Sequence, residues 1–137
     1  MAKKKNEIEV AVAEVVDYLR ITGQFLPALR EVVERKIAAN AARESGVKVT
    51  SKQLQAAADA FRVVHGFHKA SDTESWLKTA GVSLEVFEEY IETNLLVSKF
   101  KDKLDKKVGK TKYLSTPEVK ESIREMIYRD WLAEQLG

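Results

Sequence analysis

The stretch that most constrains this chain is residues 71–90, which contain a start signal, a stop signal and a second start signal for helices. Ser71 followed by Glu74 matches a capping box, in which two side chains satisfy free N–H groups of a first helical turn. Gly81 is of the residue type that ends helices, because glycine adopts a left-handed conformation without strain. Ser83 is a preferred N-cap residue. The stretch therefore predicts a short helix over about 72–80 and a long one over about 84–107.

Apolar residues recur at three- and four-residue spacing through most of the remaining chain, which indicates further amphipathic helices. We expect them over about 6–20, over 25–45, from the Thr50 cap to about Val64, and from Pro117 onward. A length of 137 residues suits one domain with its own core, and only two prolines interrupt the pattern. We predict an all-α fold, a compact bundle of about six helices forming a single domain over residues 1–137.

Two short segments lack this periodicity. Residues 1–5 are basic and are predicted to be a disordered start, and residues 108–115 are predicted to be a linker. The final helix has a strong apolar face that includes Leu132, with Trp131 adjoining, so it must pack on something. We expect this C-terminal helix to pack back on the second, third and fifth helices.

Composition excludes several kinds of site. The chain has no cysteine, which excludes disulfides, thiolate metal sites and a cysteine nucleophile. It has no run of 18 apolar residues and no apolar signal segment, so we expect a cytoplasmic protein without a membrane span. A net charge of +2 is too small to predict a nucleic-acid partner. We assign no metal and no other cofactor.

His65 and His68, the only histidines, are the candidate catalytic residues. Either of them could serve as an acid–base group or as a metal ligand. Gly66 interrupts the helix that would align the two rings, so two polar residues in a surface turn are the favoured interpretation. The lysine-rich region 99–112 could hold an acidic peptide, but a solvated helix end followed by a basic linker is favoured there.

The larger aromatic residues form the last candidate site. Helical assemblies of this size tend to leave a groove between helices, and peptides with apolar stripes bind such grooves. We predict that this groove is lined by Phe61, Trp76, Phe87, Tyr90 and Trp131.

The helix cadence and turn residues of Leu29–Leu104 also match a known pattern. The matching segments are 29–37 (LREVVERKI), 42–54 (ARESGVKVTSKQL), Trp76-Leu77, and Gly81–Leu84 with the long helix that follows. Here the chain resembles the helical N-terminal domain of SurA-type chaperones and of parvulin-class (PpiC-type) peptidyl-prolyl isomerases.

This resemblance implies a polypeptide-binding chaperone module, in which an isomerase domain is inserted before a returning last helix. Between Leu104 and Thr116 there is room only for a linker, so isomerase activity is not expected. Similar cytoplasmic proteins look like accessory factors for the maturation or export of small peptides. They would act beside a partner enzyme or transporter.

Three functions are therefore predicted, and the first is favoured. The protein is a non-enzymatic, chaperone-like binder of a peptide or an unfolded protein client. Alternatively, it is a helical enzyme that modifies a peptide or small molecule through His65 or His68. Alternatively, it is a structural subunit, or a homodimer that exchanges its last helix across residues 108–115.

Overall fold

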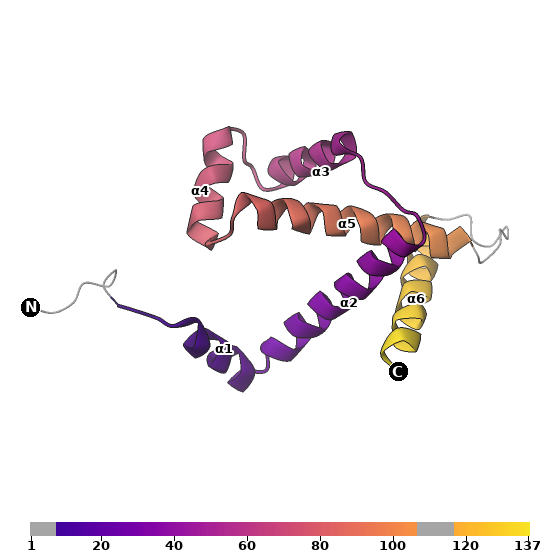
Figure 1. Cartoon of the computed structure of the whole chain (residues 1–137), viewed down its shortest axis with the longest axis horizontal. Coiled ribbons are helices and arrows are strands. Elements are labelled where there is room, and N and C mark those ends of the chain that lie inside the picture. Colours follow the sequence, from indigo (N-terminus) through magenta and orange to yellow (C-terminus); the bar gives the residue numbers. More distant parts are fainter. Residues whose placement is uncertain (1–7, 107–116) are drawn as a thin grey trace, which may run out of the picture. The chain divides into compact units, whose positions relative to one another are not determined.

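The computed structural model describes residues 8–106 and 117–137, and within these ranges the chain forms six α-helices and no strand (Figure 1). In chain order they are α1 (Val12–Ile21), α2 (Phe25–Glu44), α3 (Ser51–Val64), α4 (Ala70–Ala80), α5 (Leu84–Asp105) and α6 (Pro117–Leu136). The prediction of an all-α chain with six helices is confirmed. The predicted start at 1–5 and the predicted linker at 108–115 lie outside the described residues.

Three of the predicted helix signals are found at the predicted residues. The Thr50 hydroxyl accepts the N–H of Gln53 at 3.1 Å, and the Gln53 side chain accepts the N–H of Thr50 at 3.0 Å, a complete capping box for α3. The Ser83 hydroxyl accepts the N–H of Val86 at 3.2 Å and caps α5. Gly81 ends α4 with a φ of +70°, the left-handed conformation that glycine tolerates best.

Two helix starts differ from the prediction. The first helix begins at Val12 rather than near Asn6, and residues 8–11 are not helical. Ile8 and Val10 are β-branched, which lowers helix propensity, and Ala11 offers no capping side chain.

The start of α4 is the second difference. The prediction that Ser71 caps this helix is wrong, because the helix begins at Ala70 and includes Ser71. The carboxylate of Asp72 accepts the N–H of Lys69 at 3.0 Å, so Asp72 stabilises the first turn from within.

By its internal contacts the chain divides into residues 1–34 and residues 35–137. The described part of the first unit contains α1, a turn and the beginning of α2. The N–H of Gln24 bonds to the Leu19 carbonyl at 2.8 Å and that of Gly23 to the Arg20 carbonyl at 3.2 Å, a pattern that closes the end of α1. No residue of α1 is buried. The prediction of a single domain stays a prediction.

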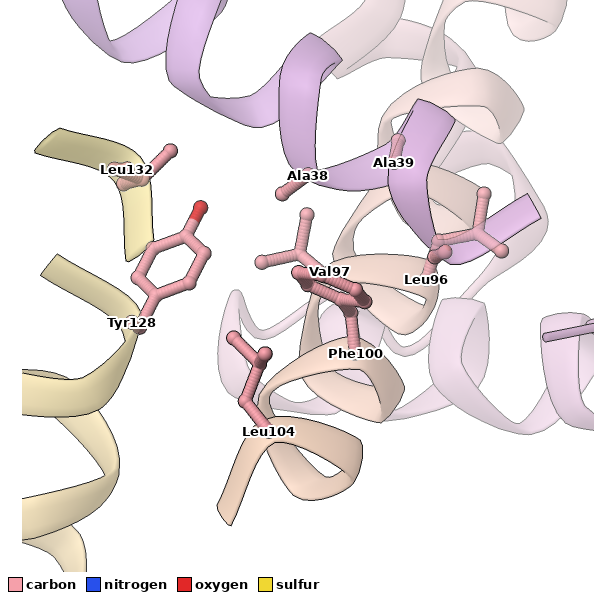
Figure 2. Close-up of a cluster of buried hydrophobic side chains, with 9 residues drawn as sticks. Ala38, Ala39, Leu96, Val97, Phe100, Leu104, Tyr128 and Leu132 are labelled. Atoms are coloured by element: carbon pink, nitrogen blue, oxygen red, sulfur yellow. The ribbon is translucent and has the colours of Figure 1, made fainter. Parts of the chain in front are cut away.

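The second unit is built on α5, which carries two separate groups of buried residues. The larger group, here called the α5–α6 core, combines three alanines of α2 with apolar side chains of α5 and α6 (Figure 2). The small alanines allow the backbones to approach closely. The core consists of Ala38, Ala39, Ala42, Leu96, Val97, Phe100, Leu104, Tyr128 and Leu132. The predicted packing of the last helix on the second and fifth helices is therefore confirmed, whereas its packing on the third helix stays a prediction.

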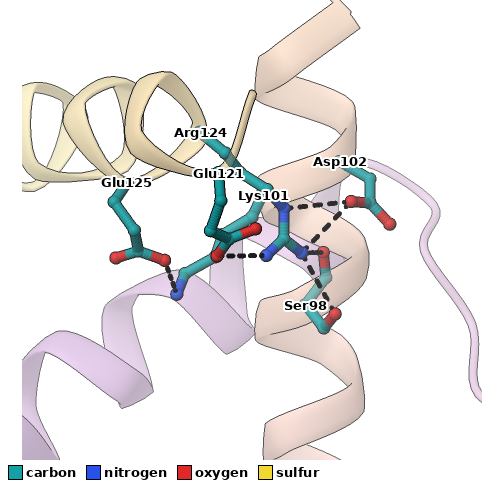
Figure 3. Close-up of polar contacts among 6 residues, drawn as sticks. All are labelled: Ser98, Lys101, Asp102, Glu121, Arg124 and Glu125. Atoms are coloured by element: carbon teal, nitrogen blue, oxygen red, sulfur yellow. Dashed lines mark hydrogen bonds and ion pairs between the residues drawn. The ribbon is translucent and has the colours of Figure 1, made fainter. Parts of the chain in front are cut away.

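Polar contacts also join α5 and α6 (Figure 3). The guanidinium of Arg124 donates to the Asp102 carboxylate at 3.1 Å and to the Ser98 carbonyl at 2.9 Å. The ammonium of Lys101 donates to the Glu125 carboxylate at 2.7 Å. This hydrogen bond from Lys101 is the main reason why the pKa of Glu125 lies below its ordinary value. These contacts link the two helices beside their apolar core.

The second buried group, here called the α3–α5 core, lies where α3 runs alongside the first half of α5 (Figure 1). It consists of Ala58, Leu77, Phe87 and Ile91, which come from α3, α4 and α5. This core has fewer buried residues than the α5–α6 core, and half-buried apolar residues pack against it, among them the aromatic Phe61 and Trp76. It forms the base of the site described next.

Candidate functional site

Six ring side chains gather above the α3–α5 core, and we call them the ring cluster: Phe61, His65, Phe67, Trp76, Phe87 and Tyr90. Phe61 comes from α3, Trp76 from α4, and Phe87 and Tyr90 from α5. The Thr50 cap, the Gly81 stop and the Ser83 cap set the registers that direct these side chains to one place.

Phe61 is at the centre of the ring cluster. Its ring centroid lies 5.5 Å from that of Trp76, 5.1 Å from that of Phe87 and 6.3 Å from that of Tyr90. Most of these pairs are tilted or edge-to-face, the arrangements that aromatic quadrupoles favour. The rings therefore form one packed surface.

Exposure rises from the base of the cluster outward. Phe87 is 2% exposed, Phe61 and Trp76 are half-buried, and Tyr90 is 47% exposed. The guanidinium carbon of Arg35 lies 4.9 Å from the centre of the Tyr90 ring, a cation–π distance. Aromatic surface thus remains open to a ligand, with a fixed positive charge at its edge.

Trp131, the fifth residue predicted for the groove, is not in the ring cluster. It packs against the α5–α6 core, where its ring meets that of Phe100 edge-on at 4.7 Å. The structure therefore brings four of the five predicted peptide-binding residues together and places Trp131 in other surroundings.

The two histidines also have different surroundings. The His65 ring stacks on Phe61 at 3.9 Å, and its Nδ1 lies 2.9 Å from the Phe61 carbonyl oxygen. His68 lines a cavity on the neighbouring side of α4. Within residues 8–106 and 117–137, no group of three His, Asp or Glu side chains is placed to hold a metal ion. The catalytic role of either histidine stays a prediction.

The cavity has a volume of about 640 Å³ and lies between α3, the turn into α4, α4 and the first residue of α5. Its apolar lining includes Val63, Phe67, Leu77 and Leu84. Phe67 belongs to both the cavity and the ring cluster, and Leu77 belongs to both the cavity and the α3–α5 core. The cavity and the ring cluster are therefore adjacent.

Two further residues that line this cavity, Phe67 and Thr73, were not predicted from the sequence as site residues. Phe67 stands beside Gly66 in what was interpreted as a polar turn. Thr73 precedes Trp76 by three residues and Leu77 by four, and this spacing places all three on one helical face. That spacing was the available signal.

Two lysines of the lysine-rich region, Lys99 and Lys103, make hydrogen bonds to a neighbouring segment. Lys99 donates to the Lys48 carbonyl at 2.6 Å and to the Gln53 side chain at 2.7 Å, and Lys103 donates to the Ser45 carbonyl at 2.6 Å. These two lysines therefore join α5 to the connection between α2 and α3. The part of the region from residue 107 onward lies outside the described residues.

None of the helices in the described ranges is long and apolar enough to cross a membrane. No protein-family model matches the chain, and neither a curated protein nor a solved structure matches it at a significant level.

Proposed function

We propose that this protein binds an apolar peptide or an unfolded polypeptide segment on the ring cluster, in the manner of a chaperone. The observation that carries the proposal is that six rings meet in one cluster while only Phe87 among them is buried.

The physical reason is the amount of apolar surface that this arrangement leaves in contact with water. An aromatic side chain can bury about 150–250 Å². When several such residues form one exposed apolar patch, the patch usually marks an interaction site. A peptide with apolar side chains would cover the half-buried Phe61 and Trp76 and the exposed Tyr90.

The resemblance to chaperone-type helical domains that is expected from the helix cadence of Leu29–Leu104 would imply the same kind of ligand. In that setting the protein acts as an accessory factor in the maturation or export of a small peptide, and a partner enzyme or transporter receives the client. The ring cluster supplies the holding surface and needs no catalytic group.

The two tryptophans provide the test. The Trp131→Phe variant leaves Trp76 as the only tryptophan, and the Trp76→Phe variant leaves Trp131. Each variant is titrated with a short peptide of alternating leucine, phenylalanine and serine, and with an all-serine control. We expect the emission of Trp76 to shift and that of Trp131 to stay constant. A Trp76 signal that never responds to the apolar peptide would contradict the proposal.

Two exposed tyrosines give a matched pair of variants. Tyr90→Ala removes a ring of the cluster, whereas Tyr18→Ala removes an exposed tyrosine of α1. Truncating an aromatic residue that contacts the ligand at a binding hot spot costs about 1 kcal/mol or more, so Tyr90→Ala should weaken peptide binding by about fivefold or more. Tyr18→Ala should leave it unchanged, and equal affinities for the two variants would count against the ring cluster as the site.

A further inference from the structure

A polar group in the lining of the cavity beside the ring cluster lacks a hydrogen-bond partner among the described residues. Thr73 is 6% exposed, and its hydroxyl oxygen is buried without a hydrogen-bond partner among the described residues. Buried hydroxyl groups nearly always have a partner, because the group loses its bonds to water on burial. It is the only buried side-chain polar atom of this kind in the described ranges.

The position of Thr73 in α4 makes its missing hydrogen bond unusual. It lies in the early part of α4, where a threonine hydroxyl ordinarily bonds back to a carbonyl one turn earlier. Valine would fill the same space without a buried polar atom, so the hydroxyl destabilises the free protein. A residue that costs stability beside a cavity is a candidate for ligand binding.

The charges around the cavity indicate the chemistry of the ligand. Arg62 is paired with Asp59 at 3.0 Å, so these two charges largely cancel. Lys69 at the start of α4 and Glu74 within it contribute one charge of each sign. The positive end of α4 already faces the Asp72 carboxylate. The balance therefore favours an uncharged ligand over a free anion.

We propose that this cavity is a subsite for one apolar residue of a bound peptide, and that Thr73 hydrogen-bonds the main chain of that residue. The peptide side chain lies against Phe67, Leu77 and Leu84. Threonine has two side-chain rotamers available in helices, so rotation about one bond turns the hydroxyl toward the cavity. A hydroxyl both donates and accepts, which suits a peptide group that offers N–H and C=O.

The proposal of this subsite rests on the proposed function. It adds how one residue of a bound client is held. Because Phe67 belongs to both the cavity and the ring cluster, a segment bound across the rings continues into the cavity. The rings then provide most of the affinity, and Thr73 fixes the position of one residue.

The test uses Thr73→Val in the full chain, with Thr79→Val, an exposed position of α4, as the matched control. The thermal midpoint is measured without ligand, and the dissociation constant is measured with the fluorescein-labelled leucine–phenylalanine–serine peptide. We expect Thr73→Val to raise Tm by a few degrees and to weaken binding about three- to tenfold, the effect of one lost hydrogen bond. Thr79→Val should change neither quantity. Thr73→Ser, which keeps the hydroxyl, should bind like the wild type.

The remaining outcomes separate the two proposals. If Thr73→Val binds the peptide as tightly as the wild type, the subsite is overturned while the ring cluster stands. If Thr73→Val lowers Tm, the hydroxyl already has a partner in the free protein and the subsite is again overturned. If the wild type itself gives no binding and no response of Trp76, the proposed function fails together with the subsite.

Discussion

Replacing Leu132 by alanine tests how firmly α6 is held. Leu132 is 1% exposed and belongs to the α5–α6 core, where it completes a layer with α2 and α5 (Figure 2). Replacing a buried leucine by alanine removes apolar contacts and leaves a cavity, and such changes cost about 2–5 kcal/mol. Since domains are stable by only about 5–15 kcal/mol, this one change should remove a large part of the total.

The matched control is Leu136→Ala, the same substitution one turn later in α6, where the leucine is 51% exposed. An exposed substitution of this kind changes stability by less than about 0.5 kcal/mol.

Urea unfolding followed by Trp131 fluorescence in the Trp76→Phe background reports on the α5–α6 core directly. With a slope of about 2 kcal/mol per molar urea, the midpoint should fall by about 1–2.5 M for Leu132→Ala and hardly at all for Leu136→Ala. Equal shifts for the two variants would refute the packing of α6 described above.

Three further predictions concern pH and helix ends. The pKa of Glu125 is lower in the folded than in the unfolded protein, because its carboxylate pairs with Lys101. At any pH above the pKa of Glu125 in the unfolded protein, this pairing stabilises the fold. The stabilisation is lost as the pH falls through the pKa of Glu125 in the folded protein. Between about pH 6 and pH 3 the Tm of the wild type should therefore fall more than that of Glu125→Gln, and parallel curves would contradict this. Thr50→Ala removes the hydroxyl that accepts the N–H of Gln53 and should cost about 1 kcal/mol in urea unfolding, and an unchanged urea midpoint would contradict this. Gly81→Ala forces a side chain into a left-handed conformation at a φ of +70° and should cost about 1 kcal/mol, and a rise in Tm would disprove that account.

Helix existence could be predicted because its signals are local. The Thr50 and Ser83 caps and the Gly81 stop act through residues within a few positions along the chain, and all three are found as predicted. The start of α4 was mispredicted because two overlapping capping patterns compete there. Asp72, which bonds Lys69, outweighs Ser71. Local pattern alone does not rank such alternatives.

The candidate site was predicted in part for a related reason. Phe61, Trp76, Phe87 and Tyr90 share apolar helical faces, so their meeting follows once three helices pack together. Trp131 is a tryptophan like Trp76 and also lies on a helix with an apolar face. Its ring nevertheless packs against Phe100 and not in the ring cluster. Which apolar face meets which is decided by long-range contacts, and no short stretch of residues carries that information.

The sequence by itself determined that residues 71–90 make a helix, a glycine stop and a second capped helix, since hydrogen bonds between near neighbours decide these features. Only the tertiary structure decided that α5 carries two separate cores and that Lys99 and Lys103 bond backbone carbonyls. Only the tertiary structure shows that the Thr73 hydroxyl has no hydrogen-bond partner among the described residues. Whether such a group is buried and bonded depends on segments that are distant along the chain.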